Sequence, residues 1–137
     1  MQVSQKGLYA LKALMLLARR YPEHVVKIRE IAADEQLPEK FLELILLELK
    51  RARIVESVRG ARGGYRLKRP PAEILLGEII RTIDGPLAPF QDAESLRRLV
   101  ANDKKHRALF RVFLAVRDAA SNILDRTSLA EICYGAD

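Results

Sequence analysis

The sequence predicts a mainly α-helical chain that carries one small β-hairpin. Apolar residues recur at the helical period over most of its 137 residues. One stretch, residues 54–68, alternates instead with period two on either side of a glycine-rich turn. A composition of 49% hydrophobic, 31% charged and only 6% aromatic residues suits one helical core and excludes a disordered chain.

Three helices are predicted in the first 50 residues. The first spans residues 6–20, with Ser4 as its N-cap and Pro22 after its end. A short extended stretch at residues 25–27 leads into a helix of about two turns that starts at Ile28 and ends at a tight break at Gln36-Leu37. The third begins with Pro38 at its first position, where the missing N–H costs little. Its inward face carries Phe41, Leu42, Ile45, Leu46 and Leu49.

The hairpin follows the third helix directly. Residues 54–59 and 65–68 alternate as strands do, and Gly60-Ala61-Arg62-Gly63-Gly64 lies between them. Glycines allow the positive φ angles that a hairpin turn needs. Two helices joined by a short turn and followed by such a hairpin predict a winged helix-turn-helix.

The second half predicts helices at residues 76–84, 93–100 and 107–126. We expect a winged helix-turn-helix region at 1–85, then an effector-type loop and a dimerisation helix at 86–137, within one compact domain. The long helix has an apolar stripe too wide for so short a chain to cover, which predicts a homodimer. The alternative is that this helix packs on residues 6–20 of its own chain. The stripe consists of Leu109, Val112, Phe113, Val116, Ala120, Ile123 and Leu124.

Charge points to a nucleic-acid partner. The net charge is +6, and the first 70 residues hold 15 basic against 8 acidic residues, so all of the excess lies there. Eight basic residues and one acid occupy residues 50–69, a pattern expected for phosphate contacts, with a solvated surface as the alternative. The elements around the cluster decide between the two. The single cysteine, Cys133, excludes an intrachain disulfide. The longest apolar stretch is too short to cross a bilayer, so we expect no membrane partner and a cytoplasmic protein.

The predicted site is a double-stranded DNA interface. The third helix fits a major groove, where Glu43 can accept from a cytosine amino group and Lys40 can serve phosphate or guanine. Arg59 and Arg62 on the glycine turn suit a narrow minor groove. A nucleotide-binding loop is excluded, because Tyr65 stands where such a loop needs Lys and the loop leads into a strand.

No catalytic or metal constellation is predicted, so we expect no enzyme activity, no metal and no cofactor. His24 and His106 are the only histidines, and neither has a cysteine or carboxylate dyad at ligand or triad spacing. Cys133 is expected to be a packed thiol rather than a redox switch, since no Lys or Arg is beside it in the sequence.

The chain resembles a known family in several segments. These are residues 4–10 (SQKGLYA), Ile31-Ala32, Phe41-Leu42-Glu43, residues 58–67 (VRGARGGYRL), 76–80 (LGEII) and 128–132 (SLAEI). They are similar to the bacterial winged-helix regulators of the IscR/CymR-type, or Rrf2, family. The resemblance implies a homodimeric, cytoplasmic transcription factor, which we expect to be a repressor, on a roughly palindromic operator.

The resemblance also implies residue roles. Glu43 corresponds to the base-reading acid, Arg59 to the minor-groove arginine, and Ser4, Lys6 and Tyr9 to positions that contact the DNA backbone. Phe41 stands where many members have Tyr, and Pro38 where Ser is commoner. The complete predicted DNA-binding set is Ser4, Lys6, Tyr9, Lys40, Phe41, Glu43, Arg59, Gly60, Arg62, Gly63, Gly64 and Tyr65.

One departure from the family concerns its effector region. Members that sense iron–sulfur status carry three cysteines between the winged helix and the long helix, whereas residues 87–107 contain none. Cys133 alone cannot replace them, because clusters need several thiolates. A small-molecule effector, a protein effector or none stays open. The alternatives are an iron–sulfur, metal or redox-responsive regulator of the same family, and a winged-helix protein-interaction module.

Overall fold

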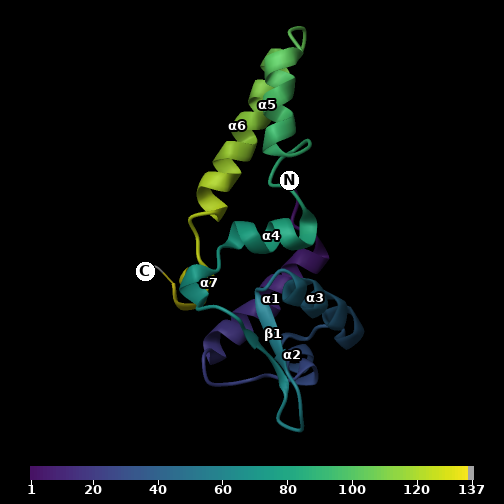
Figure 1. Cartoon of the computed structure of the whole chain (residues 1–137), viewed down its shortest axis with the longest axis vertical. Helices are drawn as coiled ribbons and strands as arrows, with labels where there is room; N and C mark the ends of the chain where they lie inside the picture. Colours follow the sequence, from purple (N-terminus) through teal and green to yellow (C-terminus); the bar gives the residue numbers. More distant parts are fainter. Residues whose placement is uncertain (136–137) are drawn as a thin grey trace.

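The computed structural model describes residues 1–135 and is mainly α-helical with a two-stranded antiparallel hairpin, as predicted (Figure 1). None of the helices in this range is long and apolar enough to span a membrane. In chain order the elements are α1 (Gln5–Arg20), α2 (Ile28–Glu35), α3 (Glu39–Arg51), β1 (Val55–Val58), β2 (Gly64–Leu67), a 3-10 turn η1 (Pro71–Glu73), α4 (Leu76–Asp84), α5 (Ala93–Asn102), α6 (Arg107–Leu124) and α7 (Leu129–Tyr134).

The ends of the first three helices follow their local sequence. Ser4 caps α1 by accepting a hydrogen bond from the Gly7 N–H at 3.0 Å, which confirms the predicted cap. Gln36 ends α2 in the left-handed conformation (φ 54°). Pro38 is the N-cap of α3 and not its first helical residue, because its ψ of 121° is extended. The prediction for this start was wrong by one residue.

The hairpin is extended by a third segment. Val55 pairs with Leu67 and Ser57 with Tyr65 in the β1–β2 register. Val26, in the stretch predicted to be extended, adds a bridge to Tyr65 through two backbone hydrogen bonds of 2.8 Å. A Cβ on Gly64 would collide with the Val26 carbonyl, so only glycine lets the two segments come this close.

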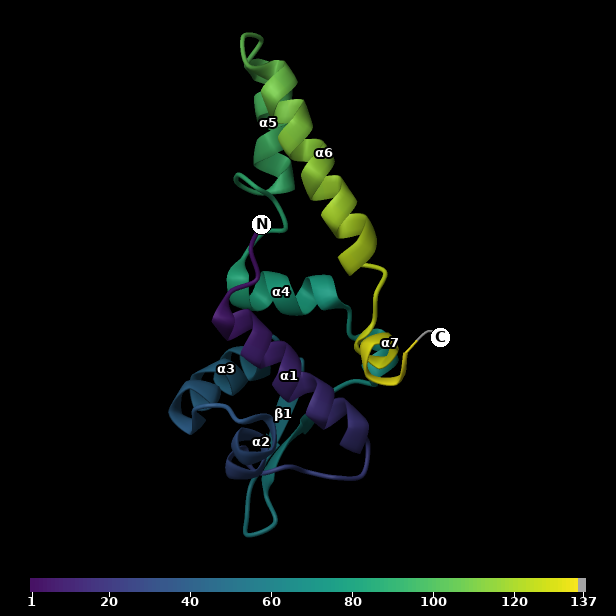
Figure 2. The same ribbon diagram turned by 180° about the vertical axis from the view of Figure 1, so that it is seen from behind.

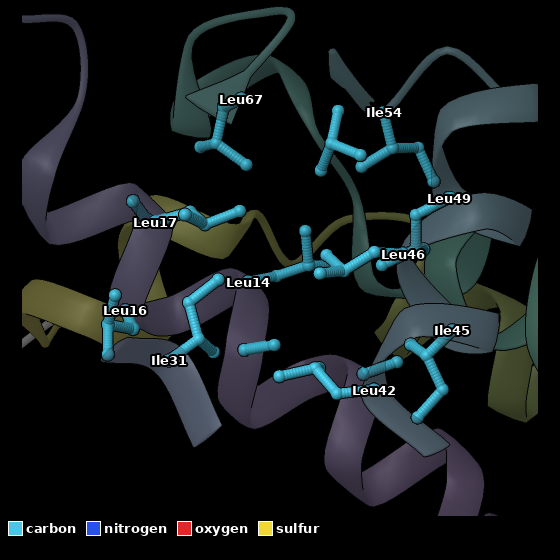
Figure 3. Packing of buried hydrophobic residues seen from close by; sticks show 14 of the residues in the cluster. Leu14, Leu16, Leu17, Ile31, Leu42, Ile45, Leu46, Leu49, Ile54 and Leu67 are labelled. Atoms are coloured by element: carbon cyan, nitrogen blue, oxygen red, sulfur yellow. The ribbon is translucent and has the colours of Figure 1, made fainter. Parts of the chain in front are cut away.

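The hydrophobic core lies in the winged-helix part (Figure 3). Leu14 and Leu17 of α1 face Leu42 and Leu46 of α3, while Leu67 closes the core from the hairpin, and all five are nearly inaccessible to solvent. Helix α7 completes this part from the other end of the chain, packing on α1 with its Leu129 fully buried. The sequence pattern does not predict this six-residue helix.

Helices α5 and α6 form a hairpin that projects away from the winged-helix part (Figures 1 and 2). Helix α6 packs on α5 and touches α4, while α7 takes the place on α1, so the alternative that α6 packs on residues 6–20 is wrong. No residue of α6 is buried. The helix ends at Leu124, two residues before the predicted end, and α5 extends two residues beyond its predicted end, to Asn102.

Helix α4 connects the two parts through polar contacts at its C-terminal half. The Ser4 N–H donates to Asp84 Oδ2 at 2.9 Å, and the Ser4 hydroxyl donates to the other carboxylate oxygen. The Arg81 guanidinium donates to both oxygens of Asp125, just after α6, at 2.6 Å each. A Cβ on Gly77 would strike Asp125, so this glycine leaves room for the carboxylate. The bidentate Arg81–Asp125 contact thus joins α4 to the end of α6.

Candidate nucleic-acid interface

The hairpin and the start of α3 line one groove. Its volume is about 420 Å³, and Glu39 of α3 faces it from one side while Gly60 and Tyr65 of the hairpin face it from the other. The N-terminal end of α2 supplies the third wall through Lys27 and Arg29. The remaining lining residues are Ile28, Ser57, Val58, Gly63 and Gly64. The hairpin and the start of α3, which the sequence predicts to bind DNA together, therefore lie side by side.

The turn of the hairpin, the wing, presents two exposed arginines. Arg59 and Arg62 are exposed, and within residues 1–135 neither forms an ion pair. Gly60 has φ 109° with open space around it, so it serves the turn conformation. Gly63 closes the turn by donating to the Gly60 carbonyl at 2.9 Å, and a Cβ there would strike the Val58 carbonyl. These glycines hold the arginines at an exposed tip.

Helix α3 turns its polar face outward beside the wing. Lys40 and Glu43 are exposed in its first turns, whereas Leu42, Ile45 and Leu46 are buried on the opposite side. Lys40 has no ion pair in the described part of the chain. The N-terminal turns of a recognition helix are the ones that reach base edges. Both predicted base-contacting residues therefore have the accessibility that contact requires.

The other flank of α3 contacts the start of α1. The Phe41 ring lies edge-on to Tyr9, with centroids 5.6 Å apart and an interplanar angle of 80°. Lys6 Nζ is 2.5 Å from Glu48 Oε1. Tyr9 and Lys6 therefore border α3 on this flank, while Ser4 caps α1 and bonds to Asp84 of α4. The predicted residues thus border α3 on both flanks, although the hydroxyl of Ser4 and the charge of Lys6 are engaged within the fold.

The basic cluster at residues 50–69 does not form one patch. Arg66 pairs with Glu56 at 2.7 Å across the hairpin, and Arg69 pairs with Glu78 of α4. Lys27 and Arg29 line the groove beside the hairpin instead, and the sequence does not predict a role for either of them. The one feature of the sequence that could have indicated this role is the extended stretch before α2. Residue spacing alone does not show that this stretch pairs with the hairpin.

Comparison with known proteins places this geometry in a family. The model of the family "Rrf2: Iron-dependent Transcriptional regulator" matches residues 3–135. The chain belongs to the Rrf2 family. It is a DNA-binding transcriptional regulator with a winged helix-turn-helix, and not an enzyme, as predicted.

Rrf2 relatives match along almost the whole chain. It is 33% identical to the HTH-type transcriptional regulator CymR of Bacillus subtilis, over 100% of this chain and 93% of that protein. It is 38% identical to Rv1287 of Mycobacterium tuberculosis, a putative HTH-type transcriptional regulator, over 99% of this chain and 83% of that protein. The structure of B. subtilis CymR, the global cysteine regulator, matches with a TM-score of 0.82 at 33% identity, covering 100% and 99% of the two chains. The structure of T. potens IscR matches with a TM-score of 0.73 at 32% identity, covering 96% and 85%.

The iron named in the Rrf2 description does not fit the donor residues of this chain. Within residues 1–135, no three His, Cys, Asp or Glu side chains gather as a metal site. His106 and Asp103, with Nδ1 and Oδ2 3.0 Å apart, lie between α5 and α6, where the contact lowers the pKa of Asp103. Cys133 lies on α7, far from that tip (Figure 1). Its thiol donates to the Met15 carbonyl at 3.6 Å, and burial raises the pKa of the thiol despite nearby Arg19.

Proposed function

We propose that this Rrf2 protein is a repressor that binds a roughly palindromic operator as a homodimer. The observation that carries the proposal is the groove lined by the wing and the start of α3. Lys27 and Arg29 are among its lining residues, and Arg59 and Arg62 are exposed on the turn of the same hairpin. Phosphate contacts from these cations would supply affinity, while Lys40, Glu43 and the wing would supply sequence preference. We further propose that repression follows from occupancy of the operator, so deleting the gene should raise transcription of genes beside its binding sites.

The homodimer would form through α6. Its outer side exposes four large apolar residues, Leu109, Val112, Val116 and Ile123, at 49%, 59%, 48% and 64%. Exposed apolar side chains in one stripe favour a protein partner, and a second α6 offers an identical stripe. Of the other predicted contacts, Phe113 lies against Phe90 and Phe110 and is only partly accessible, as are Ala120 and Leu124. In this proposal residues 1–85 bind DNA and residues 86–137 pair the subunits.

Such pairing would present two copies of α3 to the duplex. Symmetric half-sites are read when the two recognition helices are about one helical turn apart, roughly 34 Å. The operator is found by selecting binding sites from genomic fragments with the purified full-length protein. An inverted repeat with half-sites at about that spacing is expected. A selected motif with a single half-site would contradict the palindromic operator.

The wing is tested by Arg59→Ala on the selected operator. Loss of a minor-groove arginine should weaken binding by about 5- to 150-fold per half-site, since a specific arginine contact is worth about 1–3 kcal/mol. The matched control is Arg126→Ala, which removes the same charge from an exposed position after α6, remote from the groove. Titration at several salt concentrations separates the proposal from a protein-interaction module, because phosphate binding weakens steeply as salt rises. Equal affinities for the two variants would contradict the role of the wing.

A further inference from the structure

Helix α3 carries an exposed leucine that the fold does not use. Leu44 is 58% exposed, the highest value among the large apolar residues of α3, where Leu47 is 40% exposed. The apolar face of α3 is complete without it, because Leu42, Ile45, Leu46 and Leu49 are at most 1% exposed. A single exposed leucine is common on protein surfaces, so its exposure alone does not indicate a partner. The place of Leu44 on α3 does.

The position of Leu44 is on the surface assigned to DNA. One helical turn separates it from Lys40, and it follows Glu43 directly, so the three side chains share the outer half of the helix. The wing groove begins at Glu39 on one flank, and Phe41 contacts Tyr9 on the other. Leu44 therefore lies in the middle of the interface and in the N-terminal half of α3.

We propose that Leu44 contacts the C5-methyl group of a thymine in the major groove. This inference rests on the proposed function and adds a specificity-determining residue to it. Thymine is the base whose major-groove edge carries a methyl group, and apolar side chains are its natural contacts. The thymine would be adjacent or next but one to the base pair read by Glu43, because the two side chains are consecutive on the helix. Leu44 thus selects thymine over cytosine, which lacks the methyl group and presents an amino donor.

The test removes the methyl group from the DNA rather than from the protein. In the selected operator, each thymine is replaced in turn by deoxyuridine, which leaves base pairing and major-groove hydrogen bonding unchanged. Binding of the wild type should weaken about fourfold at one thymine per half-site, the value of burying one methyl-sized group, and about fifteenfold when both half-sites are changed. Leu44→Ala should bind the thymine and deoxyuridine operators equally.

Leu47→Ala is the matched control, since it removes the same apolar group one turn further along α3 and should keep the sensitivity of the wild type at that thymine. Unchanged thermal midpoints verify that both variants fold. If the protein selects an operator but no deoxyuridine weakens its binding, or if Leu44→Ala keeps the sensitivity, the role of Leu44 is overturned and the proposed function stands. If no operator is selected and duplex binding is independent of salt, both are overturned.

Discussion

Helices α3 and α6 illustrate two ways of using an apolar face. In α3, Leu42, Ile45, Leu46 and Leu49 are buried against the rest of the winged-helix part. In α6, which is longer, no side chain is buried, and its stripe stays exposed although α5 packs beside it. The winged-helix part therefore buries its apolar face within one chain, whereas the α5–α6 hairpin leaves an apolar stripe exposed, which the proposed homodimer would cover.

Different forces hold the winged-helix part together and link it to α6. The winged-helix part depends on burial of aliphatic side chains from α1, α2, α3, the hairpin and α7 (Figure 3). The link from that part to α6 is polar, with Arg81 of α4 bonded to Asp125 and the Ser121 hydroxyl donating to the same carboxylate. Aliphatic side chains carry no charge that salt could screen or acid could neutralise, whereas a partly exposed ion pair is weakened by both.

The largest expected effect comes from truncating the core of the winged-helix part. Leu46→Ala should lower the free energy of unfolding by about 3 kcal/mol, because Leu46 is fully buried and the lost methyl groups leave a cavity. Denaturant unfolding measures this value. The matched variant is Leu109→Ala on α6, which is 49% exposed and should change the unfolding free energy by less than about 0.5 kcal/mol in a dilute monomer. Similar losses for both would contradict the contrast between the two parts.

A second variant tests the partner of α6. Val112→Glu places a charge in the exposed stripe, where Val112 is 59% exposed. In the monomer the charge remains in water and costs little, but in the dimer it is buried without a partner. Dimer affinity should fall at least about a hundredfold, equivalent to roughly 2.7 kcal/mol. Sedimentation equilibrium over a range of protein concentrations measures it. Asn122→Glu is the control, since it adds the same charge to an exposed position off the stripe, and an equal loss there would exclude this interface.

Local sequence patterns predicted the helices and strands better than they predicted the contacts between them. The cap at Ser4, the glycine turn and the bounds of α4 follow from residues that are neighbours in the chain, so local chemistry suffices for them. The bridge from Val26 to Tyr65 joins residues far apart in the sequence, and no period encodes that pairing. Helix α7 was missed because only six residues carry its pattern.

In the candidate site, too, the exposure of residues could be predicted from the sequence, whereas their ion pairs could not. The exposed positions of Lys40, Glu43, Arg59 and Arg62 follow from helix and turn geometry, and the structure places them as expected. Charge counting failed for Arg66 and Arg69, because a count cannot tell which cations are neutralised by acids such as Glu56 of the facing strand. Which bases these residues contact stays a prediction.

The smallest expected effect concerns the polar link and depends on pH. The Arg81 hydrogen bonds, with a further contribution from Ser121, lower the pKa of Asp125 from 3.8 to about 2. A folded-state pKa below the unfolded value stabilises the fold above about pH 4, and this stabilisation is lost as the pH falls towards 2. Because the Asp125 side chain is 32% exposed, solvent screening reduces the contribution to about 1 kcal/mol. Asp125→Asn should therefore be less stable than the wild type at pH 6, and the difference in thermal midpoint should shrink towards pH 2. A difference that is constant from pH 6 to pH 2 would show that the carboxylate charge does not stabilise the link between α4 and the end of α6.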